Sequence, residues 1–98
     1  MDAITRRGSN SAIIVRLPAP LVDLFPGSLR RVEMHAGSVR EMVDELNRLW
    51  PGMRDRICDS TPAIRRHMNV FIDGERATLE TPIEPGTDVF ILTAISGG

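Results

Sequence analysis

The chain ends on Ser96-Gly97-Gly98, where the terminal carboxylate has no side chain beside it. Two glycines can pass through a narrow channel, and they adopt almost any φ and ψ, so one such terminus can fit several differently shaped active sites. The carboxylate of Gly98 is therefore the group best placed for chemistry, and Gly97 gives it clearance. Ile95 and Ser96 are expected to set how the tail fits one partner over another.

The other residues predict no catalytic apparatus within the chain. The sequence contains no phosphate-binding glycine loop, no recognisable pair of catalytic carboxylates, and no Ser/His/Asp or Cys/His signature. Cys58 is the single cysteine; it could hold a persulfide or a thioester, but we interpret it as a small, partly buried apolar residue. His35 and His67 have no spacing that predicts a metal site. We therefore expect that the chain is not an enzyme and that it binds neither cofactor nor metal itself.

Composition and charge exclude several classes of protein. The 98 residues suffice for one domain, with 42% hydrophobic and 26% charged residues, which is ordinary globular composition. A net charge of −1 gives no electrostatic footprint for nucleic acid or an anionic membrane. No apolar run could span a bilayer or form a signal peptide, so a cytoplasmic location is expected. All 12 basic residues are arginine, so no lysine is available for ubiquitin-style polymers.

Short strands are predicted from β-branched residues, period-two alternation and turn signals. Their approximate ranges are 11–17, 29–34, 67–72, 76–79 and 89–93. Between the first two, three prolines predict a loop that still buries some side chains. Asp73-Gly74 predicts a tight hairpin. We expect a domain over residues 11–93, preceded by a loose arm of residues 1–10 and followed by a flexible tail of residues 94–98.

The clearest predicted element is a helix over about residues 38–50. Ser38 and Glu41 form a capping box, and Pro51-Gly52 ends the helix. Apolar side chains at the helical period form one stripe, made of Val39, Met42, Val43, Leu46, Leu49 and Trp50. One such stripe must be buried against one sheet face. The sequence therefore predicts an α+β fold with one main helix on a mixed four- to five-stranded sheet. A short helical turn is expected near Ile57.

The last strand predicts a surface for a partner. Its side chains alternate, so Val89 and Ile91 are expected to face the core together with Met68, Val70 and Ile72. The other set, Phe71, Phe90 and Leu92, is then expected on the open face near the root of the tail. A solvent-facing apolar patch on a small domain marks a partner site. Two alternatives stay open here: cover by the loop of residues 52–64, and ordinary edge packing.

Arg65-Arg66 precedes the third strand and has two interpretations. The pair could steer an acidic groove of a partner, or it could belong to a solvated loop.

Several segments together resemble the ubiquitin-like β-grasp sulfur carriers, which include the molybdopterin-synthase small subunit and the thiamine sulfur carrier. They are "IIVRLP", the capped helix with "LNRLWPGMRDRI", "RRHMNVFIDGE", "PGTDVFIL" and the terminal "ISGG". The resemblance covers residues 12–98. Within the family, Leu17-Pro18 and "MNVF" after Arg65-Arg66 are most similar to the carrier of cysteine biosynthesis. Ile95-Ser96, where Val-Ala is usual, departs from that type.

The resemblance implies a fold, a reaction and a set of partners. The fold is a ubiquitin-like β-grasp with a protruding tail. A ubiquitin-activating-type adenylyltransferase, using ATP and Mg²⁺, would adenylate the Gly98 carboxylate, and sulfur transfer would give a thiocarboxylate. The acceptor would be an activated serine derivative on a pyridoxal-phosphate cysteine synthase, and a zinc metallopeptidase would then release the new cysteine. The chain is thus expected to be a protein co-substrate.

Three other functions are compatible with the same sequence. The chain could be the small subunit of molybdopterin synthase, which inserts its tail into a large subunit and gives sulfur to a pterin precursor. It could be a protein modifier that forms isopeptide bonds with lysines of its targets. It could also be a plain interaction domain in which Gly97-Gly98 is idle.

Overall fold

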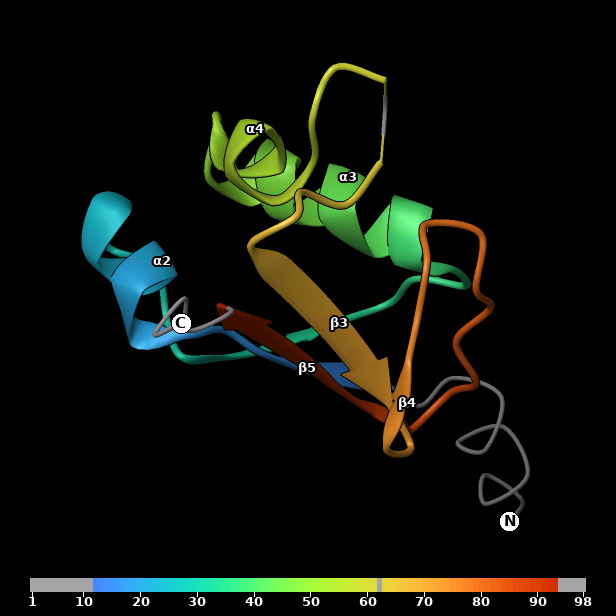
Figure 1. The fold of residues 1–98 in the computed structure, drawn as a ribbon. Helices are drawn as coiled ribbons and strands as arrows, with labels where there is room; N and C mark the ends of the chain where they lie inside the picture. Colours follow the sequence, from blue (N-terminus) through green and yellow to red (C-terminus); the bar gives the residue numbers. More distant parts are fainter. Residues whose placement is uncertain (1–11, 62, 94–98) are drawn as a thin grey trace, which may run out of the picture.

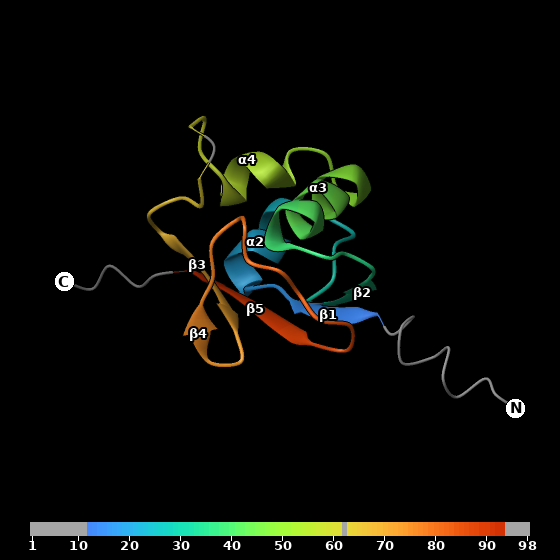
Figure 2. The same ribbon diagram turned by 90° about the vertical axis from the view of Figure 1, so that its right-hand side faces the viewer.

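The structure is a computed structural model that describes residues 12–61 and 63–93. In these residues, five strands form one sheet, and helices α3 and α4 lie together over one of its faces (Figures 1 and 2). The strands are β1 (Ile13–Arg16), β2 (Arg31–Met34), β3 (Met68–Ile72), β4 (Glu75–Arg76) and β5 (Asp88–Thr93). The helices are α2 (Ala19–Leu24), α3 (Val39–Leu49) and α4 (Met53–Ile57).

The sheet is mixed, with the order β2-β1-β5-β3-β4. The central strands β1 and β5 are parallel, with Ile14 opposite Asp88 and Arg16 opposite Phe90. The other pairs, β1–β2, β3–β5 and β3–β4, are antiparallel. The predicted α+β architecture, with one main helix on one face of a mixed sheet, is therefore confirmed, and the sheet has five strands.

Helix α3 begins where the capping box predicted. The Ser38 Oγ accepts a hydrogen bond from the Glu41 N–H at 3.2 Å, and Glu41 Oε1 accepts one from the Gly37 N–H at 2.8 Å. Four stripe residues are buried against the sheet, namely Val39, Met42, Val43 and Leu46. The end of the stripe is less buried than predicted, because Leu49 is 39% exposed and Trp50 is only half-buried.

The segment between β1 and β2 is a helix, so the prediction of a loop was wrong. Pro18 is the N-cap of α2 and Pro20 lies in its first turn, where no helical partner is needed for the missing N–H. Leu21 is 3% exposed and anchors the helix to the core. The prolines therefore limit the helix to six residues without preventing it. The helical turn expected near Ile57 is α4.

Strand β4 is shorter than predicted and ends at Arg76. Its hairpin has the expected turn, since Asp73 (φ 53°) and Gly74 (φ 81°) both have positive φ, as a type I′ turn requires. Beyond Arg76 the chain turns toward α3. There the Leu79 carbonyl accepts the Arg40 N–H at 2.9 Å, and the Thr81 carbonyl accepts the Val39 N–H at 3.0 Å. The Ala77 N–H still donates to the Val70 carbonyl of β3 at 2.7 Å. Beyond it, the carbonyls of Leu79 and Thr81 accept from the N-terminus of α3 instead of pairing with β3.

We predict that Ser38→Ala lowers the free energy of unfolding by about 1 kcal/mol, because the Glu41 N–H loses its cap. Urea denaturation measures the change. Ser60→Ala is the matched control, since Ser60 is exposed and makes no side-chain hydrogen bond within the described residues. Equal stability of the two variants would show that the cap contributes nothing.

Candidate functional site

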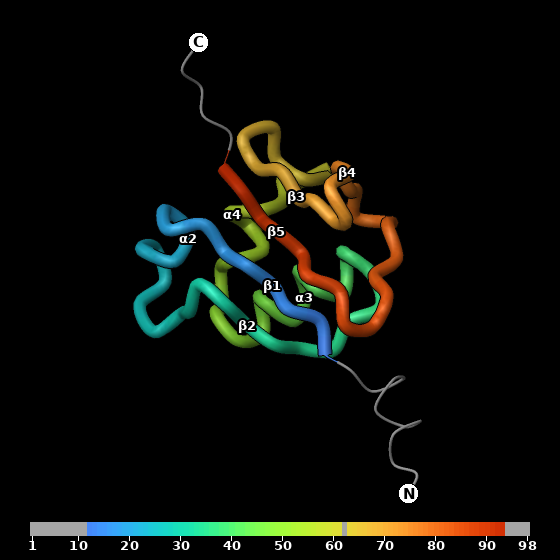
Figure 3. The backbone as a smooth tube through the Cα atoms, turned by 90° about the horizontal axis from the view of Figure 1, so that it is seen from below, coloured from blue at the N-terminus to red at the C-terminus, as the bar shows by residue number. Residues whose placement is uncertain are grey.

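The open face of the sheet carries a patch of three apolar side chains, Phe71, Phe90 and Leu92, called here the open-face patch. Strand register places Phe71 opposite Phe90, and Asn69 opposite Leu92. Phe90 is 41% exposed and Leu92 is 44% exposed, and Phe71 is half-buried. Figure 3 looks onto this face, with α3 and α4 behind the sheet and α2 at its side.

The predicted inward set is confirmed by burial. Val70, Val89 and Ile91 have no exposed surface, and Met68 is 8% exposed. Ile72 is half-buried and packs against the same core. Because successive side chains of a strand point to opposite faces, the burial of this set places the open-face patch on the other side.

The loop of residues 52–64 does not cover the patch. Met53, Ile57 and Cys58 of this segment are buried in the same core cluster as α3, which lies on the opposite face of the sheet. Within the described residues the open-face patch therefore faces away from all the buried side chains of that loop. Of the two alternatives left open by the sequence, cover by this loop is excluded.

Arg16 is a neighbour of the patch that sequence reasoning missed. It lies opposite Phe90 across the β1–β5 pair, with its guanidinium carbon 5.7 Å from the ring centroid. Its guanidinium also pairs with the Asp88 carboxylate at 3.5 Å. A cation over an aromatic face is attracted by the ring quadrupole. Alternation along β1 places Arg16 outward, but only the pairing of β1 with β5 brings it to Phe90.

The patch lies next to the root of the C-terminal tail. Leu92 is followed by Thr93, the last residue of β5, which lies opposite Met68. Since β1 and β5 are parallel, the carboxyl end of β1 and α2 lie at this same end of the sheet (Figure 1). The predicted site residues Ile95, Ser96, Gly97 and Gly98 lie outside the described residues, as do the arm of residues 1–10 and the protruding tail itself.

Cys58 lies in the core and is 5% exposed. Burial raises the pKa of its thiol, and the nearby guanidiniums of Arg54 and Arg40 oppose this only in part. The thiol is therefore held in its neutral form, which is a poor nucleophile.

Two further searches cover only the described part of the chain. It contains no cluster of three or more His, Cys, Asp or Glu residues that could hold a metal ion. None of its helices has the length and hydropathy to cross a bilayer.

Several solved structures have the same fold as this chain. The chain is similar to one chain in the crystal structure of the BexX/CysO complex from Amycolatopsis orientalis, with 26% identity over 89% of this chain and 100% of that chain and a TM-score of 0.79. It is also similar to SAMP1 from Haloferax volcanii, with 25% identity over 90% and 100% and a TM-score of 0.73. CysO from Mycobacterium tuberculosis has the same fold, with 22% identity over 85% and 99% and a TM-score of 0.75.

No family model and no curated protein sequence matches the chain. The solved structures nevertheless confirm the ubiquitin-like β-grasp fold. They also confirm the resemblance to the ubiquitin-like sulfur carriers and modifiers, and CysO is among the neighbours, as the predicted subgroup requires.

We predict that Cys58 is protected in the native state, because its thiol is buried and its pKa is raised. At pH 8 its alkylation by iodoacetamide should be at least tenfold slower in buffer than in urea, where burial is lost. Intact mass spectrometry counts the alkyl groups. Equal rates in both conditions would contradict the core position of Cys58 and would reopen a role for its sulfur.

Proposed function

We propose that this chain is a sulfur carrier. A ubiquitin-activating-type partner adenylates the Gly98 carboxylate, which becomes a thiocarboxylate and donates sulfur in biosynthesis, with cysteine as the product. One observation carries the proposal: the exposed open-face patch lies next to the tail. Its last residue, Leu92, directly precedes Thr93, where β5 ends and the chain continues toward Gly97-Gly98. A sulfur carrier needs a terminus that can enter the active site of another protein, and it needs a docking surface beside that terminus.

The energetics of docking explain why a patch is needed. Ordering the five tail residues costs about 1–2 kcal/mol each, or about 5–10 kcal/mol in total. At about 25 cal/mol per Å², about 200–400 Å² of buried apolar surface offsets that cost. Phe90 is 41% exposed, Leu92 is 44% exposed and Phe71 is less exposed than either, so the three side chains approach the lower end of this range. The open-face patch can therefore support docking, with help from surrounding contacts.

The proposed chemistry uses the terminus alone. The carboxylate attacks the α-phosphate of ATP in the partner's site, pyrophosphate leaves, and an acyl-adenylate results. Hydrosulfide then attacks the acyl carbon and AMP leaves with one of the original carboxylate oxygens, so that a C–S bond replaces a C–O bond. ATP, Mg²⁺ and the sulfur source belong to the partner, and this chain supplies only the acyl group and the surface that positions it.

Similarity to CysO favours cysteine as the product. The acceptor would then be an activated serine derivative on a pyridoxal-phosphate cysteine synthase, followed by release through a zinc metallopeptidase. The small subunit of molybdopterin synthase is the alternative within the same chemistry.

A second candidate function is protein modification. It is favoured by the similarity to SAMP1, a small archaeal modifier protein. In that case the activated terminus would form isopeptide bonds with lysines of other proteins. This sequence has no lysine, so it could not extend polymers through its own side chains.

We predict that the chain gains about 16 Da when it is incubated with its activating enzyme, ATP and a sulfur donor, because one terminal oxygen becomes sulfur. Intact mass spectrometry measures the gain. A modifier would instead appear as covalent adducts with larger proteins. The chain lacking Gly98 is the control, and it should keep its thermal unfolding curve and gain no sulfur. Sulfur transfer to this control would overturn the role of Gly98.

We predict that Phe90→Glu raises the KM of the activating enzyme for this chain about tenfold, since docking would cover a charge in place of the exposed aromatic ring. Pyrophosphate exchange measures activation. Leu49→Glu is the matched control, because Leu49 is similarly exposed but belongs to α3 in the helical layer. If both variants are activated like the wild type, the open-face patch is not the docking surface.

A further inference from the structure

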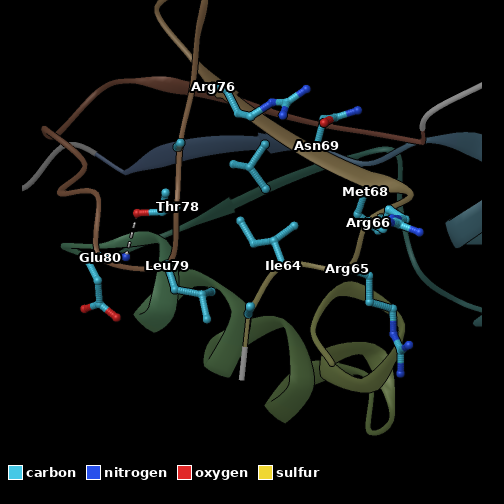
Figure 4. A pocket seen from close by; sticks show the side chains of 12 residues that line it. Ile64, Arg65, Arg66, Met68, Asn69, Arg76, Thr78, Leu79 and Glu80 are labelled. Atoms are coloured by element: carbon cyan, nitrogen blue, oxygen red, sulfur yellow. Dashed lines mark hydrogen bonds between the residues drawn. The ribbon is translucent and has the colours of Figure 1, made fainter. Parts of the chain in front are cut away.

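A groove of about 480 Å³ lies at the β3 edge of the sheet, and the proposed function leaves it unused. One wall is β3, the second is the segment of residues 76–80, and residues 63–66 close the third side (Figure 4). We call it the β3 groove. It borders the open-face patch, because Asn69, which lines the groove, lies opposite Leu92.

The β3 groove has an apolar floor and a polar rim. The floor contains Val70 and Leu79, which are buried, and Ile64, which is half-buried. The rim includes the exposed side chains of Arg66 and Arg76. Figure 4 shows the side chain of Arg76 beside Asn69, and that of Arg66 beyond Met68. An extended segment with alternating apolar and polar side chains would suit such a lining.

The two rim arginines have no charge partner in the described part of the chain. Five other arginines there form ion pairs, namely Arg16, Arg31, Arg40, Arg48 and Arg54. Arg66 and Arg76 form neither an ion pair nor a side-chain hydrogen bond among the described residues. The third groove arginine, Arg65, donates from Nε to the Asp55 carbonyl at 2.7 Å. The groove carboxylate, Glu80, already pairs with Arg40.

The strand register places these arginines near the open-face patch. Arg76 lies opposite Phe71 across the β3–β4 pair, so its side chain leaves the sheet on the same face as the open-face patch. Arg66 lies two residues before Met68, which faces Thr93 at the root of the tail. Arg76 therefore lies beside the open-face patch, and Arg66 lies near the end of β5 that leads into the tail.

We propose that the β3 groove binds an acidic, extended segment of the protein that takes the tail. Two of its carboxylates pair with Arg66 and Arg76, and an apolar side chain between them rests on Ile64 and Leu79. The identity of that protein rests on the proposed function, but the chemistry of the groove does not. A polypeptide fits better than a nucleic acid, because the surface next to the two charges is apolar and the whole chain has a net charge of −1.

The ion pairs of Arg66 and Arg76 with the acidic segment would mainly speed association and fix the position of the segment in the groove. Exposed ion pairs contribute little in water, but a guanidinium beside apolar surface becomes partly desolvated when a partner covers it. Complementary charges also speed association, and salt screens that effect. Binding at the β3 groove should therefore weaken as ionic strength rises, whereas contact with the open-face patch should not.

The first test needs no identified partner. The ¹⁵N-labelled chain is titrated with an end-blocked peptide of alternating Glu and Val, and with the same peptide carrying Gln for Glu. The Glu peptide should shift the amides of Arg66, Asn69 and Arg76, and should bind at least fivefold more weakly after Arg66→Glu or Arg76→Glu. Arg48→Glu, with the same charge change on α3, should have no effect. Equal binding of the two peptides, or insensitivity to both groove variants, would overturn the proposal.

The second test uses the activating enzyme. Arg66→Glu and Arg76→Glu should each raise KM about fivefold at 50 mM NaCl, with kcat unchanged and a smaller effect at 300 mM. If the peptide binds in the groove but KM does not change, the assignment of the groove to the activating partner is wrong. If the wild-type chain is not activated at all, the proposed function fails, and the peptide titration still decides the chemistry of the groove.

Discussion

The fold depends on the pairing of its first and last strands. β1 and β5 lie side by side at the centre of the sheet, and Val15 and Val89, which face each other, have no exposed surface. Because the two strands are parallel, the whole chain between them must cross from one end of the sheet to the other. β2 is antiparallel to β1 and β3 is antiparallel to β5, so β2 and β3 run in the same direction. Helices α3 and α4 connect these two strands across one face of the sheet, which leaves the opposite face open (Figure 1). The same pairing makes the tail continue from a central strand rather than from an edge.

The sequence predicted those parts of the fold that depend on interactions between residues close together in the chain. Ser38 and Glu41 fix the start of α3 through hydrogen bonds between residues at most four positions apart. Asp73 and Gly74 form the turn between β3 and β4 because both adopt positive φ. The alternation of Val89 to Leu92 predicted the two faces of β5, because burial on one face imposes a period of two.

The rest depended on contacts between distant parts of the chain. The prolines around α2 correctly exclude a long helix, but the short helix depends on the burial of Leu21 and on the packing of Val22 and Phe25 against the core. β4 ends early because α3 takes its acceptors from Leu79 and Thr81, which lie 39 and 42 residues along the chain from Arg40 and Val39. The same holds for the site. The sequence alone drew attention to Arg65-Arg66, but only the strand register shows that Arg16 and Arg76 lie beside the open-face patch.

The central position of β5 also has a mechanical consequence. Under the proposed function, a protein that draws the tail into its active site would pull along the axis of β5, whose residues are hydrogen-bonded to β1 on one side and β3 on the other. The pull therefore loads both ladders in shear, so that many hydrogen bonds resist together instead of opening one after another. The domain can thus anchor a terminus under tension without unravelling from its end, which a tail attached to an edge strand could not do as well.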